Sequence, residues 1–313
     1  LVDTAKNVGA DAIKFQTFKS EQVATPYTVM ADYQKKNTGS IQSQTKMLKK
    51  LELKEEFYKP ILKRCEKKGI IFLSSPHGGF ESVDFLNKLK VPAFKFGSGD
   101  LTNLPVLEYA AKFKKPMILG TGMANMLEIK EAIKCIQNTG NNKIIVLHCT
   151  TDYPCDIQNV NLKAMQAMMS ELDVLVGYSD HTLGVSVTLM ATVLGACVIE
   201  KHLTLNNKMS GPDHKASIEP NEFRKMTNSI RAVPIIFGSN LKRPTKNERL
   251  NIPVVRKSII ASYDIKKGEI FTRSNLSIKR PGNGLEPKYF FKILGKKSKR
   301  NIKKWDFITK KYF

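Results

Sequence analysis

Short apolar segments alternate with amphipathic ones through the first two-thirds of the chain. The apolar segments are rich in Ile, Val, Leu and Phe and end in polar loops, which predicts buried parallel strands covered by helices. The predicted strands are Ala12–Thr17, Ile70–Pro76, Ala93–Ser98, Pro116–Gly122, Ile144–Thr150, Val174–Asp180 and Cys197–Thr204. The predicted helices include Lys54–Lys68, Leu104–Phe113, Asn125–Gln137, Asn161–Ser170, Gly184–Leu194 and Pro220–Phe237.

This alternation predicts a (β/α)₈ TIM barrel over residues 1–238. A closed barrel of this kind has eight strands, one more than the pattern shows. The chain opens inside a predicted helix, with Val2, Ala5 and Val8 on one face and Gly9 as its end. We therefore expect a barrel that lacks its first strand, in an N-terminally incomplete copy of a longer protein, so that this chain could be inactive.

The pattern changes after the barrel. Residues 239–253 are weakly patterned and contain Pro244 and Pro253, which predicts a linker. Residues 254–313 carry short β-like runs (Val255–Ala261 and Asn275–Lys279) separated by glycine-containing loops, which predicts a small β-rich module. From Asn251 onward there are 17 Lys and Arg against 4 Asp and Glu, so this part carries +13 of the total net charge of +23.

A strongly basic protein can bind nucleic acid, an anionic membrane or small anions. Lysine dominates the excess and is spread over predicted helix faces, which favours solvated surfaces over a polyanion partner. We expect no nucleic-acid partner, because no RNP-like motif, zinc finger or helix-turn-helix is present, and no membrane partner, because no apolar run approaches the ~18 residues of a span. Nothing at the start resembles a signal peptide, so the expected location is the cytoplasm. The unclustered cysteines predict reduced thiols.

Polar side chains follow nearly every predicted strand, where a parallel barrel carries its active site. They are Lys14, Gln16, Thr17, Ser74, Ser75, Lys95, Ser98, Thr121, His148, Thr150, Thr151, Ser179, Asp180, His181, Glu200, Lys201 and His202. Any one of them could be a hydrogen-bonded polar group of the barrel wall. Their convergence on one rim favours an active site.

Two histidines end consecutive strands. Neighbouring strands lie ~4.8 Å apart, so the imidazoles of His181 and His202 can reach one divalent ion. Two imidazoles with positions left for oxygen ligands suit Mn²⁺ or a similar Lewis acid. The alternative is a pair of structural histidines that hydrogen-bond to neighbouring strands.

The segment AFKFGSGD places a cation and a hydroxyl, from Lys95 and Ser98, beside backbone amides of Gly97 and Gly99. This combination is typical of a phosphate or carboxylate site, and Lys14 could add a second positive charge. A competing interpretation makes Lys95 or Lys201 a Schiff-base nucleophile, as in barrel aldolases. The residues alone leave both interpretations open.

Longer motifs carry a family resemblance. KFQTF, FLSSP, FKFGSGD, GTGMAN, LHCTTDYP, GYSDHT, IEKHLT and SGPDHKAS occur in the order found in the sialic acid synthase family, which this chain resembles over nearly its whole length. The C-terminal VVRKSIIASYDIKKGEIF and LSIKRPGNG resemble that family's antifreeze-like (SAF) domain, which does not imply ice binding. The resemblance implies condensation of phosphoenolpyruvate with an N-acetylated mannose-type sugar to a nine-carbon 2-keto acid and phosphate. It also implies a domain-swapped homodimer.

The resemblance also assigns residues. His181 and His202 would bind a divalent metal, Mn²⁺ or Mg²⁺. Phosphoenolpyruvate would be held by Lys14, Lys95, Ser98 and Ser179, with Ser75, Gly120 and Thr151 at its margins. The sugar would contact Gln16, Tyr153 and Asp213, together with Arg280 from the partner subunit. Lys95 and Asp100 are the catalytic candidates, with Asp100 as a base or as a stabiliser of developing positive charge.

Three features refine the resemblance. The segments KFQTFKSEQ, ADYQKKNTGS and YSDHTLGVSV favour the N,N′-diacetyllegionaminate branch, which uses a 2,4-diacetamido-2,4,6-trideoxy-mannose acceptor. His77, Gly78 and Gly79 replace the usual Phe-Asp-type continuation, which we expect to loosen a loop there, and Gly120 stands where some members carry serine. The functional alternatives are a Schiff-base barrel aldolase and a non-catalytic polyanion-binding protein.

Overall fold

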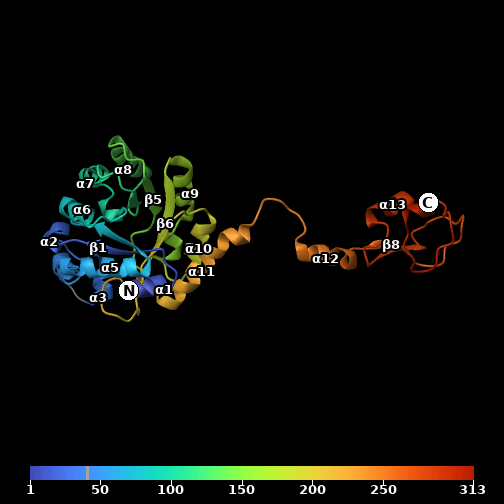
Figure 1. Ribbon diagram of the computed structural model, residues 1–313, viewed down its shortest axis with the longest axis horizontal. Helices are drawn as coiled ribbons and strands as arrows, with labels where there is room; N and C mark the ends of the chain where they lie inside the picture. The colour runs from blue at the N-terminus through green and yellow to red at the C-terminus, as the bar shows by residue number, and fades with distance from the viewer. Residues whose placement is uncertain (40–41) are drawn as a thin grey trace. The chain divides into compact units, whose positions relative to one another are not determined.

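A computed structural model describes residues 1–39 and 42–313. The chain divides into two compact units, Leu1–Phe237 and Gly238–Phe313 (Figure 1). The first unit ends beside the predicted barrel boundary at residue 238.

Unit 1 is a barrel of parallel strands with helices on its outside (Figure 1). β1 pairs with β2, β2 lies beside β3, and β3 to β7 pair in sequence order. The strands are β1 (Ala12–Thr17), β2 (Ile71–Pro76), β3 (Phe94–Phe96), β4 (Met117–Gly120), β5 (Ile144–His148), β6 (Leu175–Asp180) and β7 (Ile199–Lys201). Each lies within a predicted strand, so the predicted fold class is confirmed.

The barrel wall is open between β7 and β1. Among the described residues no backbone pairing joins these two strands, and a cavity of about 830 Å³ is lined by both of them together with α1 and α11. The opening is where an eighth strand would complete the wall.

The helices of unit 1 include all those predicted and several more. They are α1 (Val2–Asn7), α2 (Ser20–Val23), α3 (Asp32–Thr38), α4 (Gln44–Lys49), α5 (Tyr58–Lys68), α6 (Gly79–Lys88), α7 (Leu104–Ala111), α8 (Met126–Asn138), α9 (Leu162–Glu171), α10 (Ser186–Val193) and α11 (Pro220–Phe237). The expected loop after β2 is wrong beyond Gly78, because α6 begins at Gly79. The positive φ of Gly79 (67°) permits this abrupt start.

Helices pack on the strands through faces of helical period. In α8, Ile129, Ala132, Ile133 and Ile136 are buried, a spacing that places all four on one side of the helix. The cap of α8 is specified locally, since the side chain of Asn125 accepts from the backbone amides of Leu127 and Glu128.

Unit 2 has its own core. β8 (Ser258–Ala261) and β9 (Leu276–Lys279) form an antiparallel pair, and α13 (Phe290–Ile293) is its short helix. The core is formed by Ile259, Ala261, Ile265, Phe271, Leu276, Leu285, Ile293, Ile302 and Ile308. Within the predicted linker lies α12 (Lys246–Val255), which sequence analysis missed. Its start is encoded by a capping box, because Thr245 and Glu248 exchange side-chain to backbone hydrogen bonds.

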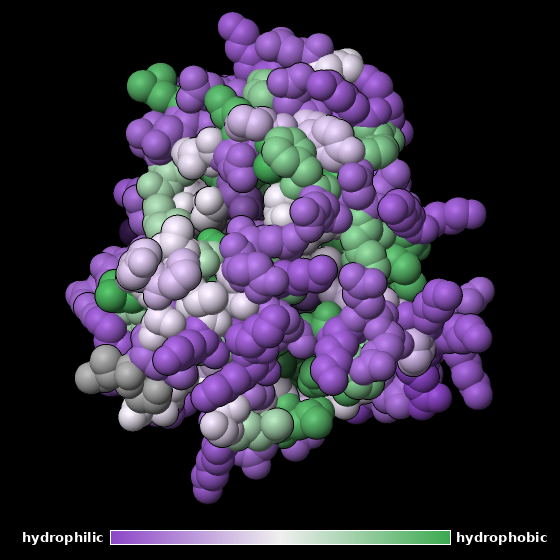
Figure 2. Space-filling view, turned by 90° about the vertical axis from the view of Figure 1, so that its left-hand side faces the viewer, coloured by the Kyte–Doolittle hydropathy of each residue, from purple (hydrophilic) through white to green (hydrophobic). Residues whose placement is uncertain are grey.

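The surface agrees with the interpretation of the lysines as solvated. The face of the molecule shown in Figure 2 is largely hydrophilic, with hydrophobic side chains scattered through it. Within residues 1–39 and 42–313, no helix has the length and apolar character that crossing a membrane requires.

The register of β6 and β7 separates two layers of side chains. Ser179 lies beside Glu200, and Asp180 lies beside Lys201. Because side chains alternate along a strand, these two pairs face opposite sides of the barrel wall. Lys201 Nζ lies 2.6 Å from Asp180 Oδ2 and donates also to the carbonyl of Thr182 at 2.8 Å. Both side chains of this ion pair are at most 1% exposed.

Removing one partner of this buried pair is expected to destabilise unit 1 strongly. Lys201→Met leaves the Asp180 carboxylate buried without its counter-charge, which costs about 3–5 kcal/mol. The control Lys130→Met breaks the half-exposed pair with Glu171 and should cost less than about 1 kcal/mol. Urea unfolding followed by circular dichroism measures both. Equal losses in the two variants would contradict a structural role for Lys201.

Candidate active site

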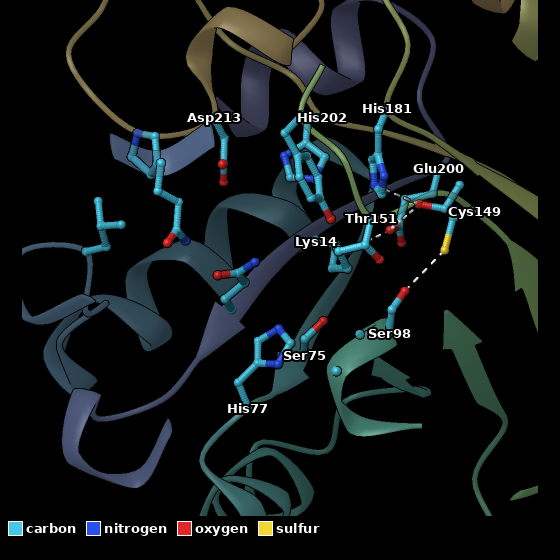
Figure 3. Close-up of a pocket in the computed structure, with 18 of the residues that line it drawn as sticks. Lys14, Ser75, His77, Ser98, Cys149, Thr151, His181, Glu200, His202 and Asp213 are labelled. Atoms are coloured by element: carbon cyan, nitrogen blue, oxygen red, sulfur yellow. Dashed lines mark hydrogen bonds and ion pairs between the residues drawn. The ribbon is translucent and has the colours of Figure 1, made fainter. Parts of the chain in front are cut away.

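A cavity of about 210 Å³ lies where the barrel strands end (Figure 3). Most residues predicted for the site line it, namely Lys14, Gln16, Ser75, Lys95, Ser98, Thr151, Tyr153, Ser179, His181, His202 and Asp213. The residues come from six different strands or the loops that follow them. The structure therefore brings together side chains that are far apart in sequence.

Glu200 organises the cationic part of the cavity. One of its carboxylate oxygens, Oε1, lies 2.8 Å from Lys14 Nζ and 3.3 Å from Lys95 Nζ, and it accepts from Ser179 Oγ at 3.1 Å. The two ammonium groups thus converge on a single oxygen, with net charge of +1 for the three groups.

Burial and neighbouring charge shift the acid–base properties of this triad. Burial is the largest cause that lowers the pKa of Lys14 to about 8; Lys95 adds to the shift and Glu200 opposes it. Burial alone would raise the pKa of Glu200, but Lys14 and Lys95 outweigh it and hold that pKa below its ordinary value. Glu200 is therefore ionised at neutral pH, and Lys14 begins to lose its proton in the physiological range.

Unpaired hydroxyls adjoin these cations. Ser75 Oγ and Thr151 Oγ1 are buried and have no hydrogen-bond partner among the described residues. Such groups are costly unless a ligand or water satisfies them. Ser98 Oγ lies nearby and accepts from the amide of Gly122 at 3.0 Å. We call Lys14, Ser75, Lys95, Ser98 and Thr151 the anion cradle.

A glycine keeps the cradle open. A Cβ on Gly122 would lie 2.2 Å from Thr151 Oγ1 and 2.9 Å from Ser98 Oγ, so no side chain fits there. Gly120 packs behind Ser98, since a Cβ there would lie 3.1 Å from the Ser98 amide nitrogen. Among the described residues Gly120 does not line the cavity.

The two predicted ligand histidines meet, as their strand positions predicted. The ring centroids of His181 and His202 are 5.6 Å apart, and the ring of Tyr153 lies 4.2 Å from the first and 5.6 Å from the second. They continue the inward-facing layer of Ser179 and Glu200 by two residues each. Figure 3 shows both rings on one side of the cavity, apart from Ser75 and His77.

The protonation of these imidazoles suits a metal ligand. His181 Nδ1 lies 2.6 Å from the carbonyl oxygen of Thr150 and so carries the proton, which leaves the Nε2 lone pair available. Burial lowers the pKa of His181, and burial with the charge of Lys14 lowers that of His202 to about 3. Both rings are neutral at pH 7. In the described part of the chain no third His, Cys, Asp or Glu joins them in a metal-binding cluster, so further ligands would be water or substrate oxygens.

The opposite part of the cavity is lined by polar and aromatic groups. Asp213 is largely buried, and this burial raises the pKa of its carboxyl group. The burial of Tyr33, together with the nearby charge of Asp213, raises the pKa of the Tyr33 hydroxyl to about 12. Tyr33 also packs against Tyr153 at 5.0 Å between centroids. This part can bind a neutral polyhydroxylated ligand through hydrogen bonds.

Several predicted rim residues are structural instead. Each has its polar group satisfied within the barrel wall: Thr17, Ser74, Thr121, His148, Thr150, Asp180 and Lys201. Lys201 is therefore a poor Schiff-base candidate, because its ammonium group is held by Asp180.

Besides Gly120, two predicted functional residues lie outside the lining. Asp100 is not among the described lining residues, and its carboxylate instead lies 2.7 Å from Nδ1 of His77, which does line the cavity. Arg280 is exposed on unit 2, just after β9, and its contact with a partner's barrel stays a prediction.

Sequence reasoning assigned no role to Glu200 or Cys149 and treated His77 only as a departure from the family pattern. Glu200 was predicted to lie at the rim, and strand alternation could have shown that it faces inward, since it shares its register with Ser179. Tyr33 and Gln34 of α3 and Met47 and Leu48 of α4 also line the cavity. Tyr33 and Gln34 belong to the segment ADYQKKNTGS that favoured the legionaminate branch, but nothing in the sequence placed any of the four at the cavity, because they come from short helices inserted between β1 and α5.

Comparison with known proteins identifies the family of this chain. The model of the NeuB family matches residues 1–242, and the SAF domain model matches residues 256–312. The chain belongs to the NeuB family. It carries that family's synthase barrel followed by a SAF domain.

The relatives of this NeuB-family chain are named synthases. The chain is 46% identical over 310 residues to N,N′-diacetyllegionaminic acid synthase of Campylobacter jejuni, covering 98% of this chain and 92% of the relative. It is 33% identical over 305 residues to human N-acetylneuraminate-9-phosphate synthase, covering 95% and 82%. A crystal structure of N-acetylneuraminic acid synthetase from Leptospira borgpetersenii is similar, with a TM-score of 0.68, 29% identity and coverage of 80% and 82%. The chain is thus an enzyme of the sialic, legionaminic and pseudaminic acid synthase family.

Anion binding in the cradle is expected to weaken as the pH rises through about 8. Protonated Lys14 attracts an anion and neutral Lys14 does not, so a pKa of about 8 predicts a roughly tenfold fall in affinity between pH 7 and pH 9. Isothermal titration with sulfate, which does not titrate in this range, measures the change. The variant Lys14→Met should bind more weakly, with little dependence on pH. A wild-type affinity that is constant over the range would contradict the assignment.

Proposed function

We propose that this enzyme condenses phosphoenolpyruvate with 2,4-diacetamido-2,4,6-trideoxy-mannose and water to give N,N′-diacetyllegionaminate and phosphate. The observation that carries the proposal is the meeting, in one cavity, of an anion cradle with two unsatisfied hydroxyls and a pair of neutral imidazoles. An enol phosphate fits the first, and a metal-activated aldehyde fits the second.

The cradle has the groups that phosphoenolpyruvate needs. Its phosphate and carboxylate carry negative charge that Lys14 and Lys95 can neutralise once they exchange Glu200 for the ligand. Ser75 and Thr151 can donate the hydrogen bonds that they lack in the described chain. Ser179 completes the set, and these contacts would orient the enol carbon toward the second substrate.

The imidazoles fit a divalent metal. His181 and His202 would hold Mn²⁺ or Mg²⁺ through their free nitrogens, and the ion would polarise the aldehyde of the open-chain sugar. The chain's own contribution is to keep both rings neutral by burial and to fix His181 through the Thr150 carbonyl. Tyr153 packs on His181 and limits its rotation.

The acceptor assignment depends on similarity and on the polar part of the cavity. The 46% identity to a legionaminic acid synthase exceeds the 33% identity to the human N-acetylneuraminate-9-phosphate synthase. Gln16, Tyr153 and Asp213 line the part of the cavity beyond the imidazoles and would hold the sugar hydroxyls and acetamido groups. We include Arg280 of a partner subunit in this set, within a homodimer.

Product analysis tests the function. Incubation with phosphoenolpyruvate, Mn²⁺ and the diacetamido sugar should release equimolar phosphate and a nine-carbon 2-keto acid, detected by mass spectrometry. N-acetylmannosamine should react at least about tenfold more slowly by kcat/KM, the size of effect that a few missing contacts produce. Pyruvate with borohydride should not label Lys95. Labelling of Lys95 together with turnover that needs no metal would contradict the proposal and indicate a Schiff-base aldolase.

Metal binding can be measured without turnover. His181→Gln and His202→Gln should each weaken Mn²⁺ binding, followed by the loss of free Mn²⁺ signal in electron paramagnetic resonance, by about 10-fold or more. His148→Gln is the control, because His148 Nε2 bonds the carbonyl of Val160 and takes no part in the cavity. Equal Mn²⁺ affinity in wild type and both variants would exclude the site.

A further inference from the structure

His77 is distinguished from the other histidines by its partner. Its Nδ1 lies 2.7 Å from Oδ2 of Asp100, and both side chains are about one-fifth exposed, at 23% and 19%. Of the five histidines, all of which lie in the described residues, it is the one paired with a carboxylate. The other ring-nitrogen contacts are to uncharged oxygens: His148 and His181 each face a backbone carbonyl, and His214 faces the hydroxyl of Thr204.

The local backbone holds the imidazole at the cavity. The amide of His77 donates to the carbonyl oxygens of Thr17 and Ser75, both at 3.0 Å, which fixes the residue at the end of β2. Gly97 makes room for the ring, because a Cβ there would lie 2.7 Å from His77 Cε1. The ring lines the cavity, while Asp100 lies behind it.

The hydrogen bond to Asp100 sets the tautomer. A carboxylate accepts, so Nδ1 carries the proton and the Nε2 lone pair is free to take another. None of the described residues hydrogen-bonds to Nε2. An imidazole held by a carboxylate, with its second nitrogen free, is the arrangement of a general base with an orienting group.

The position of the pair points to a particular proton. His77 follows Ser75 by two residues and Asp100 follows Ser98 by two, so both flank the anion cradle. Figure 3 shows His77 next to Ser75 and away from His181 and His202, where the aldehyde would lie. With phosphoenolpyruvate in the anion cradle, the carbon that bears the phosphate would lie on the side of the cavity that His77 lines.

We propose that His77, oriented by Asp100, is the general base that takes a proton from the water adding to the phosphate-bearing carbon of phosphoenolpyruvate. This inference rests on the proposed function. The enol carbon forms the carbon–carbon bond, and the aldehyde π electrons move to its oxygen. The water oxygen then bonds to the cationic carbon as His77 Nε2 removes one of its protons.

The remaining steps balance. Collapse of the adduct to the 2-keto acid breaks the carbon–oxygen bond to phosphate, whose electrons leave with that group. Of the two water protons, one ends on the former aldehyde oxygen and the other on the departing phosphate. His77 therefore carries a proton and is regenerated.

Other ionisable groups near His77 must be separated from it in a pH profile. Those lining the cavity are Lys14, Tyr33, Lys95, Cys149, Tyr153, His181, Glu200, His202 and Asp213. Glu81 of α6 is bound to Gln22 of α2 beside Gly78. Variants of His77 and Asp100 leave all of these unchanged, so a difference between profiles reports the pair.

The test compares steady-state kinetics of wild type, His77→Gln, His77→Phe and Asp100→Asn. We expect kcat to fall by about 10²-fold or more in both His77 variants, while KM for phosphoenolpyruvate changes by less than about threefold. In Asp100→Asn kcat should fall while KM for phosphoenolpyruvate stays within about threefold, because an amide can also donate to Nδ1 and no longer fixes the tautomer. In the His77 variants the acidic limb of the kcat profile should disappear. In a further variant, His77→Gly, added imidazole should restore part of the activity.

Controls separate the possible failures. Tyr109→Phe removes another hydrogen bond to a carboxylate, that of Asp84 at 2.6 Å, outside the cavity, and should leave kcat unchanged. Circular dichroism identifies any variant that does not fold, and the kinetic comparison then uses only the folded variants. Product from wild type with kcat retained in folded His77→Phe or His77→Gln overturns this inference alone. No product from wild type overturns the proposed function and this inference together.

Discussion

The alternation of side chains along two adjacent parallel strands is the constraint on which the site depends. The register that sets Ser179 beside Glu200 also sets Asp180 beside Lys201. The first pair faces the cavity and the second faces the helices, and the two histidines follow on the inward side. A shift of one residue in this register would exchange the layers, placing the Asp180–Lys201 pair in the cavity and the imidazoles against the helices. The buried ion pair thus fixes the register that the chemistry needs.

The electrostatics of the cavity follow from that placement. Three charged groups, Lys14, Lys95 and Glu200, lie together with most of their side-chain surface buried, and each alone would be costly there. Glu200 offsets the two cations in the absence of substrate, and an anionic substrate can take over that role. The same burial that lowers the pKa of Lys14 keeps His202 neutral. The same burial therefore prepares the anion cradle and the metal site that we propose.

Sequence periodicity predicted the barrel because its strands are continuous apolar runs, and β1 and α11 begin and end at the predicted residues. The meeting of His181 and His202 was predictable for the same reason, since they end neighbouring strands. The helices α3 and α4, which line the cavity, were not predicted, because a helix of six or seven residues is too short to show a clear hydrophobic period. The pairing of His77 with Asp100 joins two loops that are 23 residues apart, and only the folded chain brings them together.

The histidines show how one side-chain type acquires different tasks. A carbonyl partner, as at His181, fixes the tautomer but adds no charge, so a buried ring stays neutral and can serve as a ligand. A carboxylate partner, as at His77, fixes the proton on Nδ1 and leaves Nε2 as an acceptor, the arrangement of a general base. The two kinds of imidazole line different ends of the cavity. His181 and His202 follow β6 and β7, whereas His77 follows β2 and faces Asp100, which follows β3. With the proposed metal at one end and the proposed base at the other, a proton taken up by His77 would not cost the metal its ligands.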